Sequence, residues 1–131
     1  IMPRYKVLRT RSEPMSGPQA ATFLPVGERA EEMRLYTGAL GEVPVHFLDI
    51  PAAFERDAIY GERDDIRRFV LFARGVLAAM QHLREVTGWS PDVVHGHDWH
   101  AALVANYLRT YYAYTFGHIA SVFTIHNLAY Q

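Results

Sequence analysis

Three histidines and an aspartate lie within six positions of one short segment. His95, His97, Asp98 and His100 belong to "DVVHGHDWHAAL", residues 92–103, and follow a short apolar run. Imidazole nitrogens and carboxylate oxygens can bind a metal ion, exchange protons or hydrogen-bond to hydroxyl groups. The residue types in this cluster therefore suit a binding or catalytic site, although a histidine-rich helix start is the structural alternative.

The elements around this cluster alternate between strand and helix. "PDVVHG", residues 91–96, predicts a short strand, "DWHAALVANYLRTYYA" a helix, and "HIASVFTIHN" a second apolar strand that is followed by His126 and Asn127. Ligands of open α/β sheets bind beyond the carboxyl ends of parallel strands. We therefore expect the two polar clusters to lie at the same edge of the sheet.

A long amphipathic helix is predicted over residues 64–86. Asp64 and Asp65 suit its positive end, Gly88 follows its last turn, and arginines that include Arg68 lie on its polar side. Apolar residues recur every three or four positions on the other side. They are Ile66, Phe69, Val70, Ala73, Val76, Leu77, Met80 and Leu83.

The N-terminal part reads as a loop and hairpin region, about 9–50. Residues 9–30 carry three prolines and two glycines without a sustained period, which predicts a long loop. The runs 32–40 and 43–50 predict two strands joined by a short turn. Together with the alternating elements downstream, this predicts an α/β fold with a Rossmann-like parallel sheet and helices on both faces.

Length and composition narrow the functional classes. The 131 residues suffice for one domain, or part of one, and a net charge of −1 without charge blocks does not indicate a nucleic-acid partner. There is no cysteine, no run long enough to span a membrane and no signal peptide, so we expect a cytoplasmic location. Both ends look cut, which predicts a piece of a larger protein.

The histidine cluster is open to more than one interpretation. As a metal site, His95, His97 and His100 would be the ligands, with His126 as a fourth. As local structure, His95 ends a strand and Asp98 caps the following helix. As a carbohydrate site, Trp99 offers an apolar face to a sugar ring while the polar side chains bind hydroxyl groups.

The longer strings add a family resemblance. "PDVVHGHDWHAALVANYL", followed by "SVFTIHNLAYQ", resembles the bacterial glycogen synthase and plant starch synthase family, and so does the preceding "IYGERDDIRRFVLFARGVL". The resemblance is specific from about Asp57 to Gln131 and poor over residues 9–30. It implies a retaining glycosyltransferase of the GT-B fold, with two Rossmann-like domains across a cleft, and residues 1–131 as part of the N-terminal, acceptor-side domain.

The same resemblance implies substrates and residue roles. Glucose would pass from ADP-glucose, or UDP-glucose, to the non-reducing end of an α-1,4-glucan or maltooligosaccharide, without a metal or other cofactor. His126 matches a catalytic histidine beside the transferred glucose, and Asp98 matches an aspartate at the reaction centre. For Trp99 a packing role, and for Asn127 a turn-forming role, stay open beside the binding role. The residues implied to bind substrate are Trp99, His100, Asn127, Tyr60 and His97.

Two expected parts of such an enzyme are not found in this sequence. A glycine-rich loop like "KTGGL" and the C-terminal nucleotide-binding domain, which holds the diphosphate, are both absent from it. We therefore expect the chain alone to be inactive, with that C-terminal domain as its partner, and a plastid location if the source is a plant. A metal-dependent hydrolase and a non-catalytic glucan-binding module are the alternatives.

Overall fold

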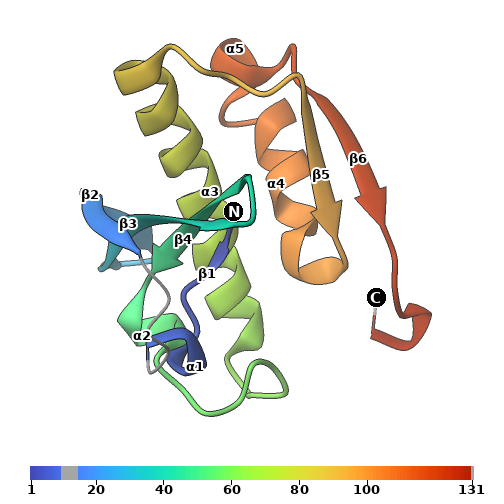
Figure 1. Ribbon diagram of the computed structural model, residues 1–131. Coiled ribbons are helices and arrows are strands. Elements are labelled where there is room, and N and C mark those ends of the chain that lie inside the picture. Colours follow the sequence, from blue (N-terminus) through green and yellow to red (C-terminus); the bar gives the residue numbers. More distant parts are fainter. Residues whose placement is uncertain (10–14, 131) are drawn as a thin grey trace. The chain divides into compact units, whose positions relative to one another are not determined.

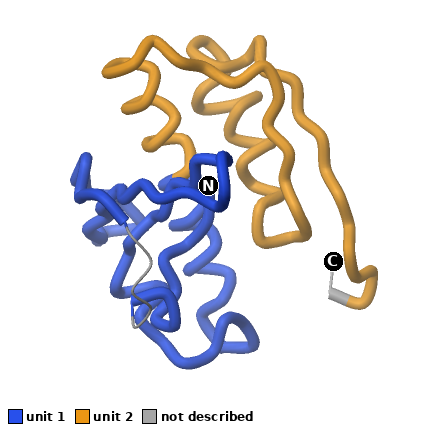
Figure 2. Tube along the Cα trace, viewed as in Figure 1, with its two compact units in different colours: residues 1–75 blue, residues 76–131 orange. Residues whose placement is uncertain are grey.

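The computed structural model describes residues 1–9 and 15–130 (Figure 1). The chain divides into two compact units, Ile1–Gly75 and Val76–Gln131 (Figure 2). Their boundary falls inside the long helix α3 (Asp65–Thr87), so each unit contains one part of that helix.

The first unit contains a four-stranded mixed sheet with the order β1-β4-β3-β2. Its strands are β1 (Met2–Pro3), β2 (Ser16–Val26), β3 (Arg29–Leu40) and β4 (Val43–Asp49). β1 runs parallel to β4, whereas the pairs β2–β3 and β3–β4 are antiparallel. The predicted hairpin over 32–50 is therefore confirmed as β3 and β4.

The prediction of a long loop over residues 9–30 is wrong for most of its length. β2 pairs with β3 through the register Ala20↔Leu35 to Val26↔Arg29, and residues 10–14 lie outside the described part. Prolines are tolerated in β2 because it is the edge strand of this sheet, where not every N–H needs a partner. Two of the three prolines that suggested a loop, Pro18 and Pro25, thus belong to an edge strand.

The core of the first unit lies between the sheet and the helices α2 (Pro51–Phe54) and α3. Leu35, Leu48 and Phe54 are buried there. Gly75 permits close packing, because a Cβ at this position would lie 3.0 Å from the Leu48 Cδ1 atom and 3.0 Å from the Met33 Sδ atom. A short helix, α1 (Lys6–Arg9), follows β1.

The long helix agrees with its predicted bounds to within a residue, but two of its side chains were assigned to the wrong side. Ile66, predicted to be apolar core, is 77% exposed. Arg68, predicted on the polar side, is fully buried. Periodicity places a residue on a helix face, but the loop that packs over the first turns of α3 decides which face is covered.

The second unit contains a two-stranded parallel sheet and the helices next to it. β5 (Val93–His97) leads into α4 (Trp99–Arg109), and β6 (Ala120–Thr124) follows the short helix α5 (Ala113–Phe116). The register runs from Val93↔Ala120 to His97↔Thr124. A one-turn 3₁₀ helix, Leu128–Tyr130, ends the described part.

A small core fixes the carboxyl end of α4 in this unit. Leu108, Phe116 and Ile119 are fully buried, and Arg109 donates hydrogen bonds to the carbonyl oxygens of Gly117 and Ile119. The chain between α4 and β6 is thereby held in place. Because α4 also contacts β5, its first turn has a defined position at the end of that strand.

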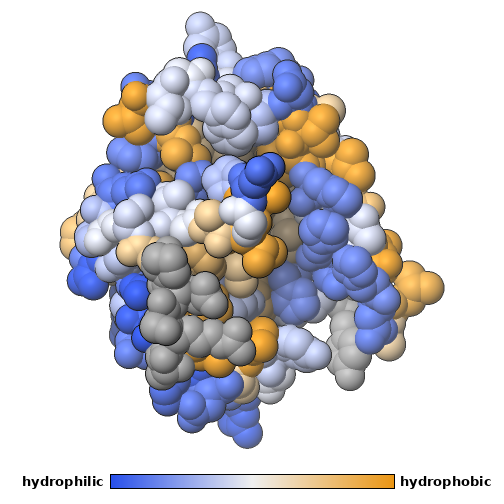
Figure 3. Space-filling view, in the orientation of Figure 1, coloured by the Kyte–Doolittle hydropathy of each residue, from blue (hydrophilic) through white to orange (hydrophobic). Residues whose placement is uncertain are grey.

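The predicted fold class is correct as α/β and wrong in its sheet. In place of one parallel sheet with helices on both faces, the described residues form a mixed sheet and a separate two-stranded parallel sheet. β5 and β6 are also less covered than their apolar sequences predict, since Val93, Val122 and Phe123 are 40–50% exposed. Figure 3 shows hydrophobic residues at the surface among hydrophilic ones.

In the described ranges, none of the helices is long and apolar enough to cross a bilayer.

Candidate functional site

The carboxyl ends of β5 and β6 bring the two predicted polar clusters together. His97, the last residue of β5, pairs with Thr124, the last residue of β6. Asp98 follows the first strand directly, and His126 lies just past the second. The expectation that both clusters lie at one edge of a parallel sheet is therefore confirmed.

Asp98 joins the two strand ends through both its backbone and its side chain. Its N–H donates to the Thr124 carbonyl oxygen at 2.9 Å, and its Oδ1 atom accepts from the His126 N–H at 2.7 Å. Its backbone has φ 57° and ψ 174°, a conformation that is otherwise almost confined to glycine. Such strain persists only where surrounding contacts enforce it, as these two hydrogen bonds do.

The predicted helix-capping role of Asp98 is wrong. Asp98 occupies the position before α4, but among the described residues its side chain makes no capping hydrogen bond to that helix. With φ near +57°, the residue departs from the β-region backbone that an N-cap residue usually has. The carboxylate is used instead to fix the loop after β6.

The pKa of Asp98 is held below its usual value. The main cause is the hydrogen bond from the His126 backbone N–H, and electrostatic interaction with the His126 and His100 side chains lowers the pKa further. The backbone N–H of Asn127 acts in the same direction, while desolvation opposes it. Asp98 is consequently an ionised carboxylate at neutral pH.

Three imidazole rings form a row along the strand ends. The ring centroids of His95 and His97 are 4.3 Å apart, and those of His97 and His126 are 5.2 Å apart with nearly parallel planes. His97 Nδ1 and His126 Nε2 are hydrogen-bonded at 3.0 Å, and His95 Nε2 bonds the Thr124 Oγ1 atom at 2.7 Å. Because one nitrogen of the His97–His126 pair must accept, at least one of the two rings is neutral.

The ligand set of the metal interpretation is not assembled. Among residues 1–9 and 15–130, no group of three or more His, Cys, Asp or Glu residues could hold a metal ion. His97 and His126 direct ring nitrogens at each other, and the His100 ring stacks on Trp99 with centroids 4.2 Å apart. These three histidines therefore contact one another or a neighbouring aromatic ring rather than converging on one point.

The other predicted site residues of the second unit lie beside the junction that Asp98 and His126 form at the ends of β5 and β6. Trp99 and His100 form the first turn of α4, and both are partly exposed. The Asn127 Oδ1 atom accepts a hydrogen bond from the Ala129 N–H at 2.9 Å, which is the contact of a turn-forming asparagine. Asn127 thus shapes the chain after His126, whatever else it binds.

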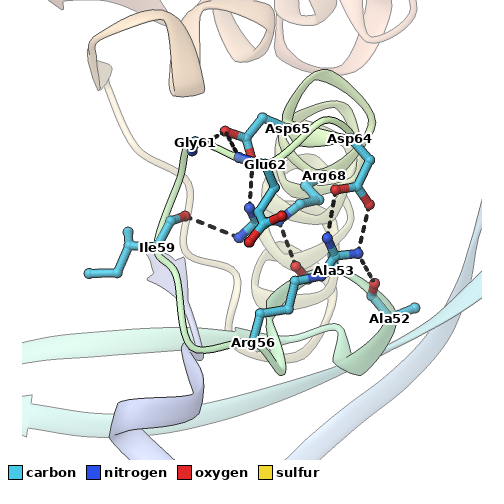
Figure 4. Close-up of polar contacts among 9 residues, drawn as sticks. All are labelled: Ala52, Ala53, Arg56, Ile59, Gly61, Glu62, Asp64, Asp65 and Arg68. Carbon is cyan, nitrogen blue, oxygen red and sulfur yellow. Dashed lines mark hydrogen bonds and ion pairs between the residues drawn. The ribbon is translucent and has the colours of Figure 1, made fainter.

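Tyr60 belongs to the first unit. It lies in the irregular segment 55–64 between α2 and α3, and it is 61% exposed. Arg68 of α3 donates a hydrogen bond to the Ile59 carbonyl of this segment, and Arg56 pairs with Asp64 within it, as Figure 4 shows. Sequence reasoning missed Arg68, although an arginine three residues after Asp65 on a helix is a recognisable signal for an ion pair.

Comparisons with known proteins identify the family of the chain. Residues 1–131 match the model of the starch synthase catalytic domain, so the chain belongs to this family of glycosyltransferases. The glycogen synthase of Syntrophotalea carbinolica is 35% identical over 138 residues, an alignment that covers 100% of this chain and 28% of that protein. The glycogen synthase of Koribacter versatilis is 43% identical over 101 residues, which cover 72% of this chain and 20% of that protein.

A solved structure agrees with this assignment. The catalytic domain of starch synthase IV from Arabidopsis thaliana, bound to ADP and acarbose, matches with a TM-score of 0.82 and 30% identity. The match covers 99% of this chain and 27% of that one. The chain therefore spans about a quarter of the length of these relatives, and it matches the starch synthase domain in fold as well as in sequence.

Proposed function

We propose that the protein containing this chain transfers glucose from ADP-glucose, or UDP-glucose, to the non-reducing end of an α-1,4-glucan. Residues 1–131 would form part of the N-terminal, acceptor-side domain of a GT-B enzyme. Family membership supports this proposal, and so does the related starch synthase that binds ADP, since ADP is what remains when glucose leaves ADP-glucose. No metal or other cofactor enters the proposed reaction.

The observation that carries the proposal is the Asp98–His126 junction. A glucosyl group in transfer has oxocarbenium character, which fixed polar groups around the sugar stabilise. Asp98 is ionised, and its bond to the His126 backbone fixes the loop that carries the imidazole. The bond between His97 and His126 fixes the orientation of that imidazole in turn. We assign Asp98 and His126 to the reaction centre on this basis.

The neighbouring side chains suit the binding of a sugar. Trp99 and His100 offer stacked ring surfaces next to Asp98, and we assign them to the acceptor and glucose side of the site. We place Asn127 beside the donor sugar and His97 among the substrate-binding residues, where it also orients His126. Tyr60 is assigned to the acceptor.

The chain does not carry the whole proposed mechanism. A retaining transfer needs the charge on the departing diphosphate to be stabilised. Relatives are more than three times as long as the part that matches, and we assign diphosphate binding to the corresponding remainder, as a C-terminal nucleotide-binding domain. The 131 residues alone should then be inactive.

Glucose transfer by the full-length protein and by residues 1–131 tests this proposal. Both are incubated with glycogen and either ADP-glucose or UDP-glucose labelled in the glucose, and the label in precipitated glycogen is counted. The proposal requires incorporation by the full-length protein from at least one donor. If the full-length protein binds maltooligosaccharide and transfers no glucose from either donor, it is a glucan-binding module instead.

A further inference from the structure

The segment 55–64 is an irregular loop whose outer part is exposed. It connects α2 to α3, and Ile59 and Tyr60 are 48% and 61% exposed. Such a loop would ordinarily sample many conformations. Here, side chains from α3 bind its backbone on both sides of Tyr60.

The pair formed by Arg68 and Asp65 makes these contacts. Arg68 Nη2 donates to the carbonyl oxygen of Ile59, the residue before Tyr60, at 3.0 Å. Asp65 Oδ2 accepts from the N–H of Gly61, the residue after Tyr60, at 2.6 Å. The two side chains are joined by a 2.5 Å bond from Arg68 Nη1 to Asp65 Oδ1. Figure 4 shows the Ile59 carbonyl directed toward Arg68, whereas the Ile59 side chain is directed away from it.

Arg68 also ties the loop to the core of its unit. Its Nε atom donates to the Ala53 carbonyl oxygen in α2 at 2.7 Å. The guanidinium lies over the rings of Phe54 and Phe69, with its Cζ atom 5.4 and 5.5 Å from their centroids. The buried charge is therefore paired with a carboxylate, hydrogen-bonded to two carbonyls and packed on two aromatic rings.

A second pair holds the base of the same loop. Arg56 binds Asp64 through two hydrogen bonds of 2.6 Å and also reaches the Ala52 carbonyl oxygen at 3.2 Å. These residues lie at the two ends of the segment. The Arg56–Asp64 pair therefore closes the loop, whereas the Arg68–Asp65 pair fixes the backbone around Tyr60.

Stability alone does not explain a buried arginine at this position. A buried ion pair can often be replaced by apolar side chains without loss of stability, because removing both charges from water is costly. What an apolar side chain could not do is bind the Ile59 and Ala53 carbonyls. The contacts of Arg68 thus specify one loop conformation, and a loop that is ordered in advance binds a ligand without the cost of ordering.

We propose that Arg68 is a positioning residue which, through Asp65 and the Ile59 carbonyl, holds Tyr60 in place for an α-glucan acceptor. The nature of the ligand rests on the proposed function, whereas the holding of the loop rests on the hydrogen bonds alone. Arg68 makes no contact with the glucan in this account. Its removal should weaken acceptor binding more than it slows the transfer step.

Three variants of the full-length protein test this role. Arg68→Met keeps an apolar stem of similar length and removes the guanidinium, and Asp65→Asn removes the charge in case Arg68→Met does not fold. The matched control is Arg67→Met, because Arg67 is the residue of α3 directly before Arg68 and binds Glu31 rather than the loop. The readouts are hydrogen exchange at the Gly61 and Glu62 amides, which both donate to Asp65 Oδ2, the dissociation constant of maltoheptaose, and KM and kcat for the glucan.

We expect Arg68→Met and Asp65→Asn to speed exchange at these amides and to raise the maltoheptaose dissociation constant and glucan KM about tenfold. We expect kcat to stay within about twofold, and the control to match the wild type. Unchanged exchange in both variants overturns the positioning role. Faster exchange with unchanged maltoheptaose affinity also overturns the proposal. Loss of affinity in a protein that transfers no glucose supports the loop inference while rejecting the proposed enzyme.

Discussion

The side-chain carboxylate of Asp98 accepts a 2.7 Å hydrogen bond from the backbone N–H of His126, 28 residues further along the chain. This bond joins the ends of β5 and β6 and unites the two polar clusters of the sequence. Because Asp98 also has a positive φ, its conformation depends on the contacts that it makes across the strand ends. Asp98 is thus both a structural link and the proposed centre of the site.

The pH dependence of this link follows from the lowered pKa of Asp98. A carboxyl group with a folded-state pKa below its unfolded value stabilises the fold fully above that unfolded value, about 3.9 for aspartate. The stabilisation is lost as the pH falls through the lower folded-state pKa. We expect the chemical shift of the His126 amide, followed by NMR, to titrate with a midpoint below about pH 3.9. A midpoint at or above that value would show that the bond does not favour the ionised form.

The strained backbone of Asp98 predicts an unusual order of stability among variants. Both Asp98→Ala and Asp98→Gly lose the carboxylate, but only glycine adopts φ 57° and ψ 174° without steric cost. Asp98→Gly should therefore be more stable than Asp98→Ala by about 1 kcal/mol. Urea denaturation of both variants measures this difference. Equal stability, or a more stable alanine variant, would show that the backbone relaxes without the side chain.

The elements of the fold were predictable where the sequence pattern is strong. The helix 64–86 and the hairpin 32–50 were found because apolar periodicity and a short turn define them locally. β2 was missed because its prolines resemble those of a loop, and only its pairing with β3 at the edge of the sheet makes it a strand. The extent of the sheet was also missed, since a continuous apolar strand does not reveal how many neighbours it has.

The site was predictable in its location more than in its contacts. Polar residues after two parallel strands indicated where His97 and His126 would meet. The capping role given to Asp98 was wrong because the bond to His126 comes from a distant part of the chain. Arg68 was misplaced for a similar reason, since its burial depends on a loop that helix periodicity does not describe.

The small core at the carboxyl end of α4 should hold this helix in position, and the first turn of the same helix belongs to the site. Phe116 is fully buried, whereas Tyr114, two residues earlier, is fully exposed. Replacing Phe116 with alanine should lower the free energy of unfolding by about 3–5 kcal/mol. Replacing Tyr114 with alanine should change it by less than about 0.5 kcal/mol. Similar losses for both variants, measured by urea denaturation, would contradict the assigned core.

The histidine row should not hold zinc tightly. The His97 and His126 ring nitrogens bond each other, and the described residues contain no group suited to a metal ion. Protein treated with chelator, supplied with zinc and then desalted should retain far less than one equivalent by elemental analysis. Stoichiometric zinc that is lost in a His97→Ala variant would instead favour the metal-dependent hydrolase.

Glucose transfer by the full-length protein and its His126→Ala variant tests the central claim most directly. With glycogen as acceptor and labelled ADP-glucose or UDP-glucose as donor, the wild-type protein should incorporate glucose. Removal of the imidazole should lower the rate at least about a hundredfold, as expected for a group that stabilises the reacting sugar. His118→Ala is a suitable control, because His118 lies before β6, at the opposite end of that strand from His126. An unchanged rate in His126→Ala, or no transfer by the wild type from either donor, would contradict the account.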